Sequence, residues 1–367
     1  MPFAEVTRMD ERRRFVLRAE QASNLSAACR EFGVTRKTGR KWLRRAREVG
    51  LENIAELSRA PRRVANKTPW EVEQALLTCR LRHTEDWGAK KLVPLLKQDD
   101  GIDIPLRTAD RILKRHGCVQ ERKTAAPELV RFERAESNLL LQMDFKGIPK
   151  STPYCPLTVL DDATRFCLRF APVQDKTGAT VFSVLWDMFE EHGLPIQMLC
   201  DNGDCWGAPG SKCPTAFEAK LMLLGIEPIH GRPRHPQTQG KVERFHGTVK
   251  LEVGLRLVQP TIELARPVCR AFTDRYNWVR PHEALGGVTP GSRYTPSPRK
   301  RPDRLPEHEI PEGALSRKVD DNGCISIKAR AFKVGKGLIG QRVVIRDDDL
   351  GPRIYFAGFP IAYLFEC

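Results

Sequence analysis

The stretch LLLQMDFKG (residues 139–147) is the first of three apolar runs that decide the fold of this 367-residue chain. YCPLTVLDDATR (residues 154–165) and RFCLRFAPV (residues 165–173) follow it after short turns. Apolar runs of this length, bounded by turn residues, are typical of strands. Their close succession predicts an antiparallel meander.

Downstream of these runs, helix and strand patterns alternate. A helix is expected over residues 177–192, a strand at IQMLCD (residues 196–201), a helix over 215–224 and a strand at GIEPIH (residues 225–230). In HPQTQGKVERFHGTVK (residues 235–250), Val242, Phe245 and Val249 have the spacing of one helix face. The order β-β-β-α-β-α-β-α predicts an α/β core, with one sheet covered by helices. We place this core at residues 137–297.

The N-terminal part reads as helix, turn and basic helix. In SAACREFGVTRKTGRKWLRRARE (residues 26–48), Gly33 ends a first helix and Thr35 is a plausible N-cap for a second. This pattern predicts a helix-turn-helix domain over residues 1–57; a solvated basic helix on a bundle is the plain alternative. The candidate DNA-binding side chains on the second helix are Arg36, Lys37, Arg40, Lys41 and Arg44.

Two further segments flank the α/β core. Residues 68–120 read as a second helical domain of winged-helix or helix-turn-helix type, because PLRTADRILKRHG (residues 105–117) resembles the second half of such a motif. A simple helical spacer is the alternative. Residues 314–367 read as strands and predict a small SH3-like β-barrel, which would contact DNA or a partner or serve as a structural cap.

The charge of the chain is unevenly distributed. The formal net charge is +15. Residues 1–67 hold 17 Lys and Arg against 8 Asp and Glu, whereas residues 137–262 hold 13 of each. A basic head before a neutral block favours a nucleic-acid-binding domain joined to a catalytic one.

The 11 cysteines are scattered, and none forms a CxxC pair. Because MPFAEVTRMDERRR at the N-terminus lacks an apolar targeting region, we expect reduced thiols in a cytoplasmic, nucleoid-associated protein. A zinc site at Cys200, Cys205, Cys213 and His230 is the alternative, although the spacing matches no common zinc pattern. No apolar stretch is long enough to span a membrane.

Three carboxylates stand out by position. Asp144 lies on the first strand, Asp201 follows a strand just before Asn202 and Gly203 turn the chain, and Glu243 lies near the start of a helix behind a polar loop. Catalytic side chains gather where the strands of an α/β sheet end. Carboxylate oxygens are the ligands that Mg²⁺ prefers, and two such ions activate the attacking and leaving oxygens of a phosphodiester. A solvated surface glutamate is the plain alternative for Glu243.

These residues resemble the DDE triad of retroviral integrases and bacterial insertion-sequence transposases. The separations are 57 residues between Asp144 and Asp201 and 42 between Asp201 and Glu243. The second gap is a few residues longer than is usual in the family, and we assign the extra length to CWGAPGSKCP (residues 205–214). HPQTQGKVERFH is similar to the family's HPQTNGKVER-type signature, and RYNWVRPHEALGG (residues 275–287) is similar to its YN-x-x-RPH-x-AL signature. The resemblance covers nearly the whole chain and is nearest to the insertion sequence 481 group.

The resemblance implies a DNA transposase with an RNase H-like catalytic core. Such an enzyme binds the terminal inverted repeats of its element and catalyses strand cleavage and strand transfer into target DNA. Asp144, Asp201 and Glu243 would hold two Mg²⁺ ions, with Mn²⁺ able to replace them. Lys250, seven residues after Glu243 and on its helix face, matches a basic position thought to touch DNA, and Lys241 and Arg244 are further candidate contacts.

Other acidic and histidine residues receive lesser roles. Asp161 and Asp162 are expected to cap a turn, and Asp204 to be a loop residue. His235 and His246 are interpreted as DNA contacts or structural residues, because Mg²⁺ favours oxygen ligands.

Two DNA ends must meet, so we expect a homodimer or larger assembly on double-stranded DNA. A separate ATPase chain is an optional partner, because nothing here resembles a Walker A loop. The alternatives are a catalytically silent DNA-binding protein, such as a repressor or domesticated transposase, and a plain RNase H-type nuclease.

Overall fold

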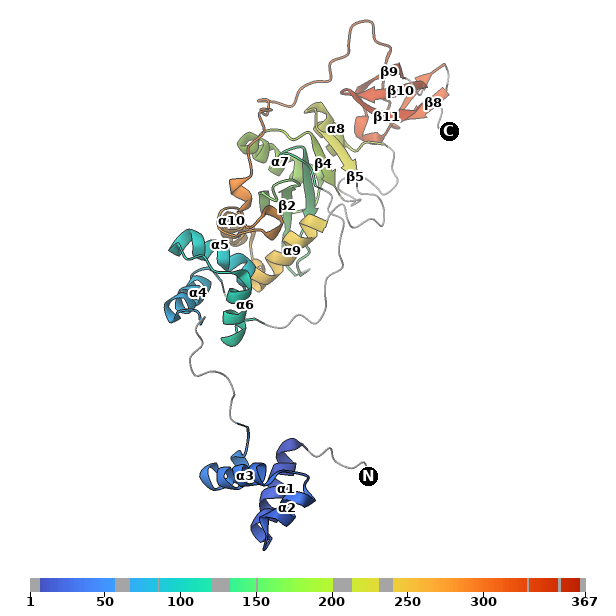
Figure 1. Cartoon of the computed structure of the whole chain (residues 1–367). Coiled ribbons are helices and arrows are strands. Elements are labelled where there is room, and N and C mark those ends of the chain that lie inside the picture. The colour runs from blue at the N-terminus through green and yellow to red at the C-terminus, as the bar shows by residue number, and fades with distance from the viewer. Residues whose placement is uncertain are drawn as a thin grey trace. The chain divides into compact units, whose positions relative to one another are not determined.

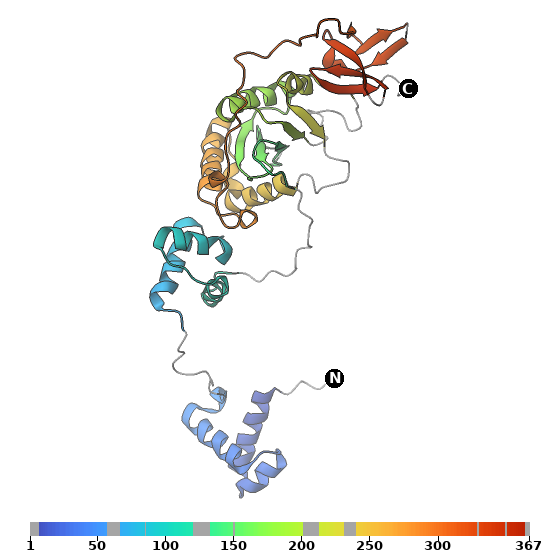
Figure 2. The same cartoon turned by 45° about the horizontal axis from the view of Figure 1, so that its top comes forward.

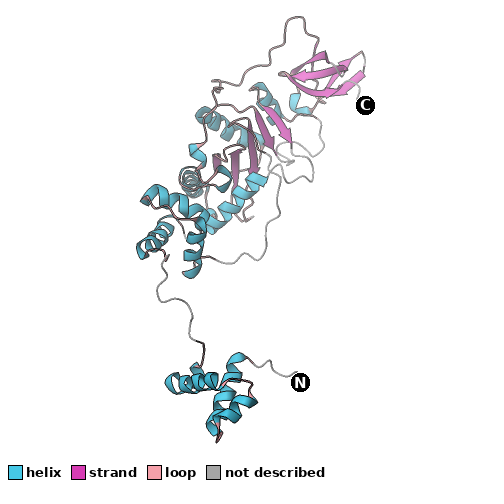
Figure 3. Cartoon of the chain, viewed as in Figure 1, coloured by secondary structure: helices cyan, strands magenta, loops and turns pink. Residues whose placement is uncertain are grey.

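The computed structural model describes residues 7–56, 67–84, 86–119, 133–149, 151–200, 213–230, 240–328, 330–348 and 351–363. The chain divides into two compact units, Met1–Thr68 and Pro69–Cys367 (Figure 1). Figure 3 shows helices in the described part of the first unit, whereas the strands that it draws belong to the second. Among the described residues, no helix combines the length and the apolar character needed to cross a membrane.

The first unit is a helix-turn-helix domain, as predicted. It contains α1 (Arg8–Gln21), α2 (Leu25–Glu31), α3 (Arg36–Val49) and the short η1 (Leu51–Asn53). Gly33 has a positive φ of 60° in the turn, and the Thr35 side chain accepts a hydrogen bond from the Thr38 N–H at the start of α3. Phe15, Trp42 and Ile54 are buried in its core. Turn and cap therefore lie where the sequence placed them.

A second group of helices opens the larger unit. It consists of α4 (Trp70–His83), α5 (Ala89–Asp100) and α6 (Leu106–Arg115). Leu76, Trp87, Leu92 and Ile112 form its buried centre. The described residues between 67 and 119 contain no strand, so the wing of a winged helix is not found among them.

A five-stranded sheet forms the middle of this unit. Its strands are β1 (Leu140–Phe145), β2 (Cys155–Asp161), β3 (Cys167–Val173), β4 (Gln197–Cys200) and β5 (Glu227–His230). The spatial order is β3-β2-β1-β4-β5. The first three strands form the predicted antiparallel meander, and β4 runs parallel to both β1 and β5. This arrangement is the RNase H-like core that the resemblance implies.

Helices cover both faces of the sheet (Figure 2). The helices are α7 (Gly178–His192), α8 (Ala216–Leu223), α9 (Gly240–Glu252), η3 (Gly254–Leu257) and α10 (Ile262–Trp278). Leu141 and Met143 of β1 pack in one core with residues of α7 and α8, while Leu160 of β2 packs in another with residues of α9 and α10. Because successive strand residues point to opposite faces, Gln142 and Asp144 lie on the face covered by α9.

A threonine N-cap precedes three of these helices. Thr177 caps α7, Thr215 forms a capping box with Glu218 at α8, and Thr261 caps α10. Each cap satisfies backbone N–H groups that the first helical turn leaves unpaired, which is worth about 1 kcal/mol. Local sequence therefore fixes where these helices start.

The C-terminal strands form an open sheet. After η4 (Glu283–Leu285) and η5 (Pro290–Ser292), the elements are β6 (Ser316–Lys318), β7 (Cys324–Ile327), β8 (Arg330–Lys333), η6 (Lys336–Leu338), β9 (Arg342–Asp348), β10 (Gly351–Phe356) and β11 (Phe359–Tyr363). The strand order is β11-β10-β9-β6, with β7 and β8 as a separate hairpin. A small β domain is therefore present, but the described strands do not close into the predicted barrel. It packs on α8, where Ala219 and Met222 join its core.

Candidate active site

Asp144 lies near the end of β1, opposite Thr158 of β2. Its side chain is 23% exposed, so solvent reaches the carboxylate although most of the side chain is covered by its neighbours. One carboxylate oxygen, Oδ1, accepts a hydrogen bond of 2.7 Å from the Phe145 N–H. The other, Oδ2, lies 3.7 Å from Nδ1 of His246 on α9.

Glu243 lies in the first turn of α9. Val242, Phe245 and Val249 are buried, and Glu243 is exposed in the first turn. Residues three apart on a helix share a face. Glu243 therefore lies on the same side of α9 as His246, whose ring contacts Asp144.

His246 is mostly buried and lies next to the Thr158 hydroxyl. Its Nε2 is 2.9 Å from the Thr158 hydroxyl, and its side chain is 13% exposed. Burial, with a smaller contribution from Lys146, lowers the pKa of His246 to about 4. The imidazole is therefore neutral at pH 7, and it packs between β2 and the Asp144 carboxylate.

Two lysines accompany Asp144. Burial and the nearby Lys250 ammonium lower the pKa of Lys146, and the charge of Asp144 partly offsets this. Lys250 is exposed on α9. Lys146 was not among the residues predicted from the sequence, although a cation two residues after a strand-end aspartate was the available signal.

The DDATR turn holds two buried carboxylates with different partners. Asp161 Oδ1 accepts hydrogen bonds from the Thr164 N–H and hydroxyl, at 2.7 and 2.6 Å, which is the expected turn cap. Burial raises the pKa of Asp161. Asp162 instead pairs with Lys241, whose ammonium lies 2.5 Å from Oδ1. Burial lowers the pKa of Lys241, whose side chain is only 15% exposed, whereas Arg244 is exposed.

Several expected site residues lie outside the described residues. They are Asp201, Asp204, Cys205 and His235. Within the described part of the chain, no group of three or more acidic, histidine or cysteine side chains could hold a metal ion. The structure thus places His246 of α9 against Asp144, whereas Asp201 lies outside the described residues.

The basic residues of α3 are exposed in the first unit, namely Arg36, Lys37, Arg40, Lys41 and Arg44. Lys41 lies 3.3 Å from Glu56 and above the Trp42 ring. Gly39 allows α3 to approach its neighbours, because a Cβ there would lie 2.6 Å from Cys29 Sγ and 2.9 Å from Phe15 Cζ. The helix therefore buries one side and presents a basic side to solvent.

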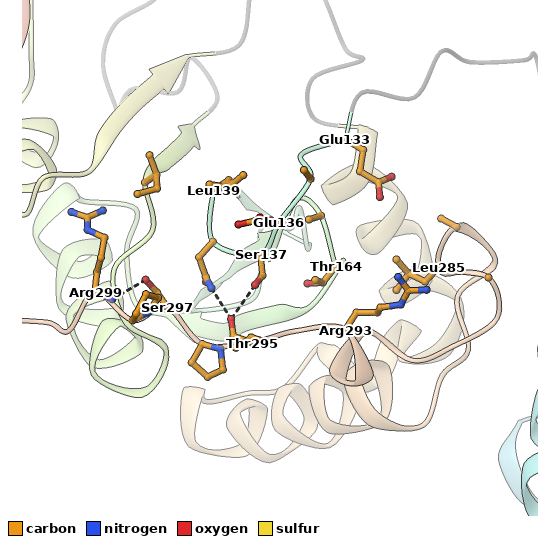
Figure 4. Close-up of a pocket in the computed structure, with 18 residues that line it drawn as sticks. Glu133, Glu136, Ser137, Leu139, Thr164, Leu285, Arg293, Thr295, Ser297 and Arg299 are labelled. Atoms are coloured by element: carbon orange, nitrogen blue, oxygen red, sulfur yellow. Dashed lines mark hydrogen bonds between the residues drawn. The ribbon is translucent and has the colours of Figure 1, made fainter.

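A cavity of about 840 Å³ lies elsewhere on the sheet (Figure 4). Ser137 and Asn138 donate hydrogen bonds to the Thr295 carbonyl there, at 3.1 and 2.7 Å. Its lining includes Leu139 and Ile196, which precede β1 and β4. It therefore lies where these strands begin, whereas Asp144 lies near the end of β1.

Models of known families match the N-terminal helices and the α/β core. Two models of the integrase core domain match residues 134–236 and 224–290. A helix-turn-helix model matches residues 11–62, and a homeodomain-like model matches residues 38–113.

Curated relatives include Transposase InsD for insertion element IS2A/D/F/H/I/K of Escherichia coli. It is 26% identical over 246 residues, which cover 58% of this chain and 79% of the relative. The InsD protein for insertion element IS2 on F plasmid of E. coli strain K12 matches equally well.

Solved structures also align. The HTLV-2 integrase catalytic core domain in complex with magnesium is 17% identical, with a TM-score of 0.35, over 44% of this chain and 99% of that one. A chain from the structure of the simian T-cell lymphotropic virus intasome in complex with PP2A regulatory subunit B56 gamma is 17% identical, with a TM-score of 0.39, over 80% of this chain and 100% of that one.

The sheet order and the sequence matches define a class, the polynucleotidyl transferases with an integrase core. Within that class, the chain is similar to bacterial insertion-sequence transposases, and it carries helix-turn-helix domains before its integrase core.

Proposed function

We propose that this transposase binds the terminal inverted repeats of its element and catalyses metal-dependent strand cleavage and strand transfer, with Asp144, Asp201 and Glu243 as its catalytic carboxylates. The observation that carries the proposal is the contact of Asp144 with His246, on the same face of α9 as Glu243. That contact supports two of the three carboxylates acting at one place. A position within the insertion sequence 481 group stays a prediction.

The donor set suits a hard divalent cation. The carboxylate of Asp144 is partly exposed, Glu243 is exposed, and oxygen ligands are those that Mg²⁺ and Mn²⁺ accept. When two Mg²⁺ ions are bound, they supply activation of the attacking oxygen and stabilisation of the leaving oxygen. Asp144 on a strand and Glu243 on a helix would hold them from two sides. Asp201 is assigned by its place directly after β4.

Lys146, Arg244 and Lys250 would orient the scissile phosphate. Two of them, Arg244 and Lys250, are exposed on α9, and Lys146 comes directly after β1. Cations beside the carboxylates offset the repulsion between an acidic site and the DNA backbone. Their function would be to place DNA, since they add no metal ligand.

Recognition of the element's ends is assigned to the basic side of α3. Arg36, Lys37, Arg40, Lys41 and Arg44 have the exposure that a recognition helix requires. We retain domain boundaries of 1–57, 68–120, 137–297 and 314–367. The second helical domain would extend the DNA contact, and a barrel-like role for the C-terminal strands stays a prediction.

Assembly follows from the reaction. Joining two ends to one target calls for a homodimer or larger complex on DNA, within the nucleoid. A separate ATPase chain would serve target choice only.

The test is cleavage and strand transfer of labelled DNA carrying the element's own ends, with Mg²⁺. Wild type should nick and join, whereas Asp144→Asn and Glu243→Gln should bind the ends and do neither. Cleavage that survives Asp144→Asn would refute the assignment. End binding by a wild-type chain that never cleaves, even with Mn²⁺ or host extract, would favour the catalytically silent DNA-binding protein.

A further inference from the structure

Asp162 is a fully buried carboxylate at the end of β2 that makes three separate connections. Its Oδ1 accepts hydrogen bonds from Gln142 Nε2 at 2.7 Å and from Lys241 Nζ at 2.5 Å. Its Oδ2 accepts one from the Arg134 N–H at 2.7 Å. Lys241 Nζ also donates to the Asp162 carbonyl at 3.0 Å.

The partners of Asp162 lie next to the candidate catalytic carboxylates. Gln142 is two residues before Asp144 on the same face of β1, and Lys241 is two residues before Glu243 in the first turn of α9. One carboxylate is therefore bonded to the strand that carries Asp144 and to the helix that carries Glu243.

A turn-capping role does not account for this arrangement. The neighbouring Asp161 caps the turn by accepting a hydrogen bond from the Thr164 N–H, and its other oxygen accepts one from the Asn138 N–H, so neither of these bonds reaches α9. The partner of Asp162 on α9 is 79 residues away. A buried carboxylate is costly unless it is paired and hydrogen-bonded, and here the pairing joins two elements.

A DNA-contact role does not account for Lys241 either. A lysine in the first turn of a helix opposes the helix dipole, so its presence there needs a compensating partner. Asp162 is that partner, and it turns the ammonium toward the sheet. Lys241 is 15% exposed, whereas Arg244 and Lys250 are exposed on the same helix.

We propose that Asp162 is a positioning residue, which through Gln142 and Lys241 fixes β1 against the start of α9 and so sets the separation of Asp144 and Glu243 for divalent-cation binding. The proposal rests on the proposed function, in which those two carboxylates are metal ligands. Asp162 itself touches neither metal nor DNA. It acts by holding the elements that do.

The experiment uses the full chain and measures Mn²⁺ binding by electron paramagnetic resonance, alongside end cleavage and end binding. Lys241→Met removes the link to α9 and leaves Asp162 bonded to Gln142 and the Arg134 N–H. We expect Mn²⁺ affinity and cleavage to fall by about 10- to 100-fold, as when the supports of metal ligands are removed. Affinity for DNA ends should stay within about twofold and keep its salt dependence. Gln142→Leu, which cuts the other link, should act in the same direction, and Lys241→Arg should restore part of the loss.

Glu252→Gln is the matched control. Glu252 forms a buried ion pair with Arg280 at the opposite end of the same helix. The control should lower the melting temperature and leave Mn²⁺ affinity unchanged. An equal loss of Mn²⁺ affinity in the control would reduce Asp162 to a general stability role and overturn the proposal.

Two further outcomes separate the possible failures. If Lys241→Met weakens DNA binding and lowers its salt slope by about one while Mn²⁺ affinity is kept, Lys241 is a phosphate contact and the positioning proposal fails. If Asp144→Asn and Glu243→Gln leave Mn²⁺ binding and cleavage unaltered, the proposed function itself fails. If Lys241→Met does not fold, Gln142→Leu decides by the same readouts.

Discussion

At the scale of single residues, the charges around Asp144 are balanced rather than uniformly acidic. Lys146 comes directly after β1, and burial together with the nearby Lys250 ammonium lowers the pKa of Lys146. Two cations placed close together repel each other, and an anion bound between them offsets this repulsion. A DNA phosphate is the anion that the proposed function supplies.

We expect Lys146→Met to weaken binding of end DNA and random DNA alike, and to reduce the salt slope of binding by about one, because one phosphate contact is lost. Measuring affinity at several salt concentrations checks this. Lys220→Met is the control, since Lys220 of α8 lies over the Phe182 ring of α7. An unaltered slope in Lys146→Met would exclude a phosphate contact.

His282 predicts acid sensitivity of the fold. Burial, followed by the nearby Arg280 charge, lowers its pKa from 6.5 to about 3, and its Nε2 is buried without a hydrogen-bond partner. The folded chain favours the neutral ring, so this contribution is complete above pH 6.5 and is lost as pH falls toward 3. Between pH 6.5 and 5 the loss is about 2 kcal/mol in the free energy of unfolding. Urea unfolding at both pH values should show this, and His282→Gln should reduce the difference; an equal difference in the variant would contradict it.

At the scale of elements, α9 is held at both ends. Asp162 pairs with its first turn, and at its last turn Glu252 accepts a hydrogen bond of 2.8 Å from the Trp87 indole and pairs with Arg280. Arg275 lies 5.1 Å from the centre of the Trp87 ring. The second helical domain therefore contacts the helix that carries Glu243.

We expect Trp87→Ala to cost about 3–5 kcal/mol of unfolding free energy, because a large side chain with 1% exposure is removed. Trp87→Phe should cost less, since it chiefly loses the hydrogen bond to Glu252. Trp70→Ala is the matched control in the same domain. Trp70 is 62% exposed, and its loss should change stability by less than about 0.5 kcal/mol. The buried contact of Trp87 with Glu252 is called the Trp87 junction below. Similar losses of stability for Trp70→Ala and Trp87→Ala would contradict a stabilising role for this contact.

Alanine substitutions at two helical glycines, one on α3 and one on α9, should change stability in opposite directions because the two sites are packed differently. Gly39→Ala should destabilise the first unit and weaken end binding, because the new Cβ would overlap Cys29 and Phe15. Gly247→Ala on α9 meets nothing within 4 Å and should stabilise its helix by up to about 1 kcal/mol. Thermal unfolding and end binding of both variants check this. A neutral Gly39→Ala would show that α3 can move away from its neighbours.

Local patterns predicted much of this architecture. The helix α7 occupies Gly178–His192, where the sequence predicted a helix over residues 177–192, and Thr35 is the expected cap of α3. Such features depend on neighbours in sequence.

The long-range partners were not predictable in the same way. Trp87 and Glu252 are 165 residues apart, and no periodicity encodes that pairing. Asp162 looked like a turn residue because its local sequence is that of a turn. The described C-terminal strands confirm a small β domain but do not close into a barrel, since closure depends on edge pairing and register rather than on strand propensity.

At the scale of the whole molecule, the chain separates a basic head from a charge-balanced core. The first unit has its own buried cluster around Phe15 and Trp42. Its excess positive charge attracts DNA from a distance, and this attraction weakens as the salt concentration rises. End recognition and chemistry are thus assigned to different units.

We expect a fragment of residues 69–367 to keep its folded structure and to lose preference for the element's ends. The measurements are its melting temperature and the ratio of its affinities for end DNA and random DNA. Residues 1–68 alone should retain most of the preference. End preference retained by residues 69–367 would move recognition to the second helical domain.

The Trp87 junction has a practical consequence for producing the catalytic part of this protein. The integrase-core matches begin at residue 134, which invites expression from about that point. A chain started there would lack the indole that covers Glu252, and the apolar side of this junction would face water. Such preparations should aggregate on concentration, whereas chains begun before Trp70 would stay dispersed and be suited to crystallisation.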